Sequence, residues 1–158
     1  MPSDTFQYND VVQHEWVDYN GHMNDAAYAK VFSLAVDAFI EHIGLDEQTR
    51  DTLGYSIFTL ETHICYLREV LENQPIQVRL QLLDCDKKRL HVFFEMQTEI
   101  DGASVVVATS EQMLMGMNME EGRPSAFPER VEQNISAIWN VHKHLKSPKK
   151  AGRQIGIN

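Results

Sequence analysis

The chain is poor in the features of secreted, membrane-spanning and disulfide-stabilised proteins. It has only two cysteines, Cys65 and Cys85, which are far apart and form neither a CxxC pair nor a zinc-ligand spacing. We expect both to be reduced thiols that are buried or half-buried. No apolar run approaches the ~20 residues that cross a bilayer. The polar segment 1–10 also lacks the apolar core of a signal peptide. These absences predict a cytoplasmic protein without a membrane partner.

Positive charge is also scarce. The chain has 14 Lys and Arg against 23 Asp and Glu, giving a formal net charge of -9. This balance argues against a nucleic-acid partner, and it disfavours an anionic coenzyme unless cations gather locally. They do gather, at Lys87-Lys88-Arg89 and again near the C-terminus at Lys146, Lys149, Lys150 and Arg153.

Length and composition indicate one globular domain. The chain has 158 residues, 43% of them hydrophobic and 23% charged, with no repeat or low-complexity run. We assign residues 1–145 to the domain and residues 146–158 to a basic C-terminal tail.

Hydrophobic periodicity predicts an α+β order of elements. A helix from Asn24 to about His42 has apolar residues at spacings of three and four, with Asn24 or Asn20 as its N-cap and Gly44 as its stop. Pro128 suits the first turn of a closing helix. The segment 46–54 reads as a polar connection. Strands are predicted at 6–16, 55–67, 76–82, 90–96 and 104–117, with an Asp-Gly turn at 101–102. Such an antiparallel sheet would carry its helices on one face.

The loop before the long helix contains a specific motif. Asp18, Gly21, His22, Asn24 and Tyr28 match D-x-x-G-H-x-N-x-x-x-Y. With the flanking strand and helix, this motif resembles the 4-hydroxybenzoyl-CoA thioesterase-like superfamily. The resemblance implies a hotdog fold, in which a curved antiparallel sheet of about five strands wraps a long central helix, with a C-terminal helix added.

Further segments are similar to the betainyl-CoA thioesterases of carnitine breakdown. They are Trp16 to Met23, Tyr55 with Glu61 to Ile64, Asp86 to His91, and Glu111 to Met113. The resemblance implies hydrolysis of betainyl-CoA, or of another small acyl-CoA, with coenzyme A as part of the substrate and no separate cofactor or metal. It also implies a homodimer or a dimer of dimers, since pairing would protect an exposed sheet edge.

Thioester hydrolysis needs a carboxylate and an oxyanion site. Asp18 is the candidate nucleophile or general base, and its structural alternative is a loop cap. Unpaired N–H groups at Gly21, His22 and Met23, near the helix N-terminus, would stabilise the oxyanion. His22 would orient Asp18 or the carbonyl, or only hold the loop. Asn24 would hold water or the thioester oxygen, or cap the helix.

The candidates for substrate binding follow from the chemistry of the acyl group and of CoA. A trimethylammonium group binds over aromatic faces, often beside a carboxylate. The candidates are Trp16, Tyr19, Tyr28, Tyr55 and Phe58, with Glu61 as counter-charge and Thr62 beside it. For the aromatics the alternative is core or dimer packing, and for Glu61 it is simple solvent exposure. Candidates for the CoA phosphates are Arg68, Lys87, Lys88, Arg89 and Arg153.

Two other functions remain open. A hotdog dehydratase or hydratase would also place an acid or base near a helix N-terminus. A non-catalytic acyl-CoA-binding protein would keep the fold without turnover. The position of Asp18 directly before the helix favours the thioesterase.

Overall fold

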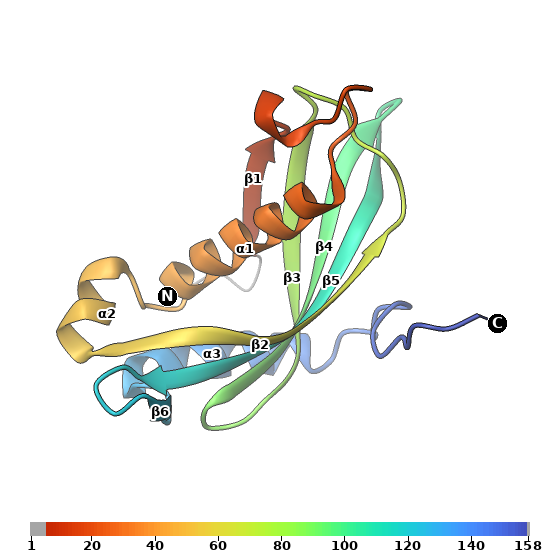
Figure 1. Cartoon of the computed structure of the whole chain (residues 1–158). Helices are drawn as coiled ribbons and strands as arrows, with labels where there is room; N and C mark the ends of the chain where they lie inside the picture. Colours follow the sequence, from red (N-terminus) through yellow and green to blue (C-terminus); the bar gives the residue numbers. More distant parts are fainter. Residues whose placement is uncertain (1–5, 158) are drawn as a thin grey trace.

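The structure is a computed structural model of the chain, and it describes residues 6–157 (Figure 1). Its elements, in chain order, are β1 (Gln7–Val11), a 3-10 turn (His14–Trp16), α1 (Asp25–His42), α2 (Glu47–Leu53), β2 (Tyr55–Tyr66), β3 (Pro75–Cys85), β4 (Arg89–Ile100), β5 (Ala103–Asn118), β6 (Arg123–Pro124) and α3 (Glu129–His142).

The strands form one antiparallel sheet in the order β1-β3-β4-β5-β2, with β6 paired to β5. Strands β3, β4 and β5 follow one another as a meander, and Asp101 and Gly102 make the positive-φ turn between β4 and β5. Strand β2 precedes the meander in the chain but pairs with β5 at the far edge. One register irregularity, between Thr59 and Glu61, adds a bulge to β2.

The curled sheet wraps around α1 (Figure 1). The apolar face of α1 is fully buried, and its side chains share one core with the inner face of the sheet and with α3. Phe32, Phe39, Phe94 and Leu114 are among the largest side chains in this core. The expected hotdog arrangement, with a long central helix and a C-terminal helix, is therefore confirmed.

Asn24 is the N-cap of α1, because its Oδ1 accepts a hydrogen bond from Ala27 N at 2.9 Å. The helix ends at His42, and Gly44 follows with φ 109°, in the left-handed region that suits a stop. The apolar spacing that predicted α1 is absent from its neighbour α2.

The polar connection predicted at 46–54 is wrong, because it contains α2. Asp46 caps this helix, accepting from Thr49 N at 2.8 Å, and Gly54 ends it in the left-handed conformation. None of its residues is buried, so no apolar period could reveal it.

The first strand is also shorter than predicted. β1 ends at Val11, and the chain then turns through the 3-10 segment that buries Trp16. Elsewhere, Cys65 and Cys85 are free and partly buried. None of the described helices is long and apolar enough to cross a membrane.

Candidate active site

The loop between Trp16 and α1 is a tight hydrogen-bonded turn. Asp18 N donates to the carbonyl oxygen of His22 at 2.9 Å, and Gly21 N donates to that of Asp18 at 2.9 Å. Gly21 has φ 79°, which an L side chain rarely adopts. The turn leads directly into the N-cap of α1, so Asp18 lies in the loop that precedes the positive end of the helix.

The two carboxylate oxygens of Asp18 have different environments. Oδ1 accepts from Asn20 N at 2.9 Å and from His22 N at 3.2 Å. Oδ2 has no hydrogen-bond partner within residues 6–157, and the residue is exposed. The carboxylate therefore caps its own loop with one oxygen and leaves the other free for chemistry.

The N–H groups expected to be unpaired at Gly21, His22 and Met23 are already engaged. The first two donate within the loop, and Met23 N donates to the carbonyl oxygen of Val70 at 2.9 Å. That detail of the prediction is wrong. Asp25 N, at the first helical position, has no acceptor in the described chain, so it is the donor left for an oxyanion.

The side chains of His22 and Asn24 contact neighbouring parts of the fold rather than Asp18. His22 Nε2 lies 3.4 Å from Glu69 Oε2, and its ring makes no hydrogen bond to Asp18 within the described residues. Asn24 uses both ends of its amide: Oδ1 caps α1, and Nδ2 donates to the carbonyl oxygen of Trp16 at 2.8 Å. Asn24 was expected either to hold water or the thioester oxygen or to cap the helix, and in the structure it caps the helix.

A cleft of about 320 Å³ opens at the start of α1. It is lined by Met23, Asp25, Tyr28, Tyr66, Leu67, Arg68 and Glu69. Tyr28 and Tyr66 meet edge to face, with ring centroids 5.3 Å apart. Tyr28 donates its hydroxyl to the carbonyl oxygen of Arg68 at 3.0 Å. Burial raises the pKa of Tyr28 and of Tyr66, so both phenols stay neutral donors at neutral pH.

The other aromatic candidates lie away from this cleft or do not line it. Trp16 is buried in the core, and Tyr19 is 96% exposed at the tip of the loop. Tyr55 is buried at the opposite end of β2, where its hydroxyl donates to the carbonyl oxygen of Ser125 at 2.8 Å. The Tyr55 phenol therefore packs against Ser125 and does not line the cleft of its own chain.

Glu61 and Thr62 are exposed on the edge strand β2. They line a groove of about 460 Å³, together with His63, His91, Glu111 and Arg153. Glu111 Oε2 lies 2.7 Å from His91 Nε2. Within one chain, Glu61 therefore has histidines, a carboxylate and an arginine as neighbours rather than an aromatic cage.

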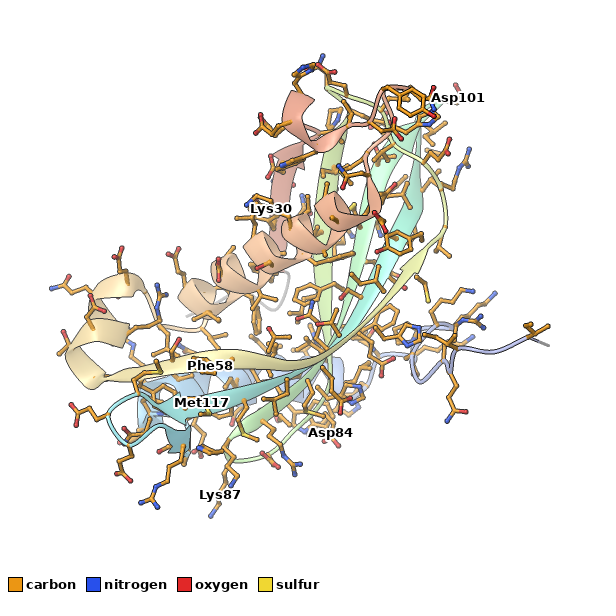
Figure 2. The ribbon with its side chains drawn as sticks, in the orientation of Figure 1. Lys30, Phe58, Asp84, Lys87, Asp101 and Met117 are labelled. Carbon is orange, nitrogen blue, oxygen red and sulfur yellow. The ribbon has the colours of Figure 1, made fainter. Side chains whose placement is uncertain are left out.

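Only one of the expected CoA-binding residues lies near Asp18 in the same chain. Arg68 lines the cleft at the start of α1. Lys87, Lys88 and Arg89 form the turn between β3 and β4, where Arg89 Nε donates to Asp86 Oδ2 at 2.8 Å. This turn lies at the opposite end of the sheet, since Arg89 pairs with Met115 while the Asp18 loop bonds near Val70, after the other end of β2. Figure 2 labels Lys87 at that opposite end.

Sequence reasoning missed Tyr66, Asp25 and Glu69 as members of the cleft. Tyr66 could have been found, because strand alternation puts it on the same face of β2 as Thr62 and Ile64, towards α1. Glu69 follows the end of β2, in a connection whose path no sequence period predicts.

The curled antiparallel sheet around one long helix is a hotdog arrangement, and Asp18 leaves one carboxylate oxygen free in the loop before that helix. The chain belongs to the thioesterase-like superfamily, which it matches over residues 12–135. The betainyl-CoA thioesterase of Pseudomonas aeruginosa PAO1 is 44% identical to it over 150 residues, covering 95% of this chain and 93% of that protein.

Two further relatives extend this picture. A Rhizobium protein named L-carnitine dehydrogenase/betainyl-CoA thioesterase is 37% identical over 92% of this chain, which matches only 29% of that longer protein. A Staphylococcus aureus protein solved in complex with CoA has 35% identity and a TM-score of 0.90, covering 100% of this chain and 98% of its own.

Proposed function

We propose that the chain hydrolyses betainyl-CoA to glycine betaine and CoA, with Asp18 as the catalytic carboxylate. The observation that carries the proposal is that Asp18 has one oxygen bound to its loop and one oxygen free, in the loop that precedes α1. The substrate is supported by the relatives named betainyl-CoA thioesterase.

The reaction follows from this geometry. Asp18 Oδ2 takes a proton from water while the water oxygen attacks the thioester carbonyl carbon. The carbonyl oxygen becomes an oxyanion that accepts from Asp25 N and is stabilised by the helix dipole. The C–S bond then breaks, and the departing CoA thiolate takes the proton from Asp18. Direct attack by the same oxygen, giving a mixed anhydride that water hydrolyses, uses the same positions.

The cleft at the start of α1 suits the acyl group. Trimethylammonium cations bind over aromatic faces, and Tyr66 lies there with Tyr28 against it. Asp25 and Glu69 also line the cleft and supply negative charge. A cationic head would therefore lie close to the carbonyl held at Asp25 N, as the short betainyl group requires. We assign the head to this cleft, and Glu61 is the competing assignment.

A second copy of the chain completes the site for CoA. β2 is an edge strand with unpaired backbone groups, and Phe58 and Leu60 are exposed along it. Antiparallel pairing of two β2 strands about a two-fold axis reverses the second copy. Its Lys87-Lys88-Arg89 turn then lies at the end of the joined sheet that holds Asp18 of the first copy. The phosphates would be bound by one copy and the thioester cleaved by the other.

The test compares Asp18→Asn with Asp18→Ala in a thiol-release assay. The asparagine variant keeps an oxygen that caps the loop but loses the negative charge, whereas the alanine variant loses both. We expect Asp18→Asn to lower kcat by at least about 100-fold with unchanged unfolding. Asp18→Ala should also destabilise the loop. Full turnover by Asp18→Asn would contradict the proposal and favour a non-catalytic role for the carboxylate.

The substrate is tested with a matched pair of thioesters. Tert-butylacetyl-CoA has the shape of betainyl-CoA without its charge. We expect a higher kcat/KM for betainyl-CoA, and Glu61→Gln should leave the ratio of the two kcat/KM values unchanged if the cation binds at Tyr66. A loss confined to betainyl-CoA would move the cation site to Glu61. Equal wild-type rates on both substrates would contradict betainyl-CoA as the preferred substrate.

A further inference from the structure

One row of residues crosses the outer face of the sheet, opposite α1. Gln81 of β3 pairs with Phe93 of β4, Phe93 pairs with Glu111 of β5, and Glu111 pairs with His63 of β2. Side chains in register on neighbouring strands point to the same face. The row therefore runs straight across the sheet and ends at the free edge of β2.

The C-terminal arm (residues 143–157) follows this row. Gln81 Nε2 donates to the carbonyl oxygen of Lys146 at 3.2 Å over β3. Gly152 N donates to Glu111 Oε1 at 2.7 Å over β5. Between these two contacts, Phe93 is only 2% exposed, although α1 lies on the other face of the sheet. The arm thus crosses the strands in the order β3, β4, β5.

The next step of the arm reaches the edge strand. Gly152 turns the chain with φ 74°, and Arg153 lines the groove formed with Glu61 and His63 of β2. Beyond Arg153 the chain has no further strand to cross. Figure 1 shows the last residues leaving the body past β2.

Two isoleucines lie on this projecting end of the arm. Ile155 is 90% exposed and Ile157 is 104% exposed, and both values are high among the exposed large hydrophobic side chains of the described chain. Their spacing of two puts both on one side of an extended segment. Single exposed apolar residues are common, but a pair on a segment fixed at Glu111 is typical of a docking element.

We propose that the arm is exchanged between two copies of this chain, with Ile155 and Ile157 packing on the outer face of the second copy. The proposal rests on the β2-paired dimer of the proposed function. A copy paired at the edge of β2 lies directly in the path of the arm. Its outer face carries Phe58, which is exposed and pairs with Met115 on β5, beside the same edge.

Charge favours the same partner. The arm carries Lys143, Lys146, Lys149, Lys150 and Arg153, while the whole chain has a net charge of -9. A second copy has the same negative net charge, and Glu61 is exposed on the edge of β2 that it would present. A basic arm on an acidic partner adds long-range attraction to the apolar contact. Glu111 fixes the root of the arm on its own subunit.

The experiment compares wild type with Ile155→Ser/Ile157→Ser. The matched control is Leu53→Ser/Met119→Ser, which removes two exposed apolar side chains at 51% and 49% exposure, away from the row. The dimer dissociation constant is measured by sedimentation equilibrium. Trypsin cleavage after Arg153 is followed by intact mass, because a docked arm shields that bond. Thiol release is measured on each protein.

We expect the arm variant to raise the dimer dissociation constant at least about tenfold and the control variant to leave it unchanged. We also expect the wild-type dimer to resist trypsin cleavage after Arg153. Dilution of the wild type below its dissociation constant, or the arm substitutions, should make that bond labile. A variant dimer as tight as wild type, with cleavage equally fast in both, would overturn arm exchange while leaving the dimer intact. A monomeric wild type that still releases thiol would overturn both the dimer and the arm, but not the thioesterase.

Discussion

At the scale of single residues, the candidate site depends on groups that do two things. Asp18 caps its loop with Oδ1, as its structural interpretation predicts, and leaves Oδ2 available for the catalytic role that we propose. Asn24 is different, because both ends of its amide are used in the framework. A motif of five residues therefore contains one free reactive atom, and the remaining members fix its position.

Tyr66 gives a residue-scale prediction about specificity. If the trimethylammonium group lies over its ring, Tyr66→Leu should lower kcat/KM for betainyl-CoA by roughly threefold to thirtyfold and spare tert-butylacetyl-CoA. Tyr66→Phe keeps the aromatic face and is the control. It also loses only a long hydroxyl contact of 3.3 Å to the carbonyl oxygen of Asp25. Equal losses on both thioesters in Tyr66→Leu would reduce Tyr66 to a packing residue.

Asp86 gives a prediction about pH. Hydrogen bonds from the Arg89 guanidinium and from the N–H groups of Lys88 and Arg89 lower the pKa of Asp86 from 3.8 to about 2. The ionised form stabilises the folded turn fully above the ordinary pKa, and this contribution is lost as pH falls through about 2. The difference in unfolding free energy between wild type and Asp86→Asn should be constant above about pH 5 and shrink below about pH 4. Urea titrations at each pH measure it, and a difference that does not change with pH would refute the assignment.

At the scale of elements, close packing links β2 to β5. A Cβ on Gly116 would lie 1.8 Å from the Tyr55 hydroxyl oxygen and 2.9 Å from the Ser125 carbonyl oxygen. Gly116→Ala should therefore destabilise the fold by roughly 3 kcal/mol or more, as overpacking does. Tyr55→Phe removes the nearest atom at the cost of one hydrogen bond, about 1 kcal/mol.

The double variant tests this contact directly. Gly116→Ala/Tyr55→Phe should lose clearly less stability than the two single variants added together, as measured by urea unfolding. Additive losses would show that Ser125, rather than the Tyr55 hydroxyl, sets the limit.

Much of this layout follows from local pattern, and the exceptions have identifiable causes. The helical spacing of apolar residues and the capping residues predicted α1, and the alternation of apolar and polar residues predicted β3 and β4. The helix α2 buries no residue and so leaves no apolar period. The partner of the Tyr55 hydroxyl is Ser125, far along the chain, so the sequence could not show that this aromatic is used in packing. The motif identified the loop, while which N–H groups stay free depends on Val70, outside the motif.

At the scale of the whole molecule, the proposed parts of the site lie at two ends of one chain. Asp18 and the tyrosine cleft lie at one end of the sheet, and the Lys87-Lys88-Arg89 turn lies at the other. The proposed two-fold axis at the edge of β2 would bring these parts together, because it exchanges the two ends. Catalysis would then belong to the pair of copies rather than to either copy.

This arrangement predicts complementation between two inactive variants. Asp18→Asn keeps its basic turn, and Lys87→Glu/Lys88→Glu keeps Asp18. A mixed dimer has one site with Asp18 from the second protein and the basic turn from the first, and its other site lacks both. Random reassociation of equal amounts makes half of the dimers mixed, so thiol release should recover to about a quarter of wild type. In the control, the two variant dimers are mixed without the dilution and reconcentration that let subunits exchange. This mixture should recover no thiol release. If the basic turn served the site of its own chain, each site of the mixed dimer would lack one part, and the mixture would stay as inactive as its components.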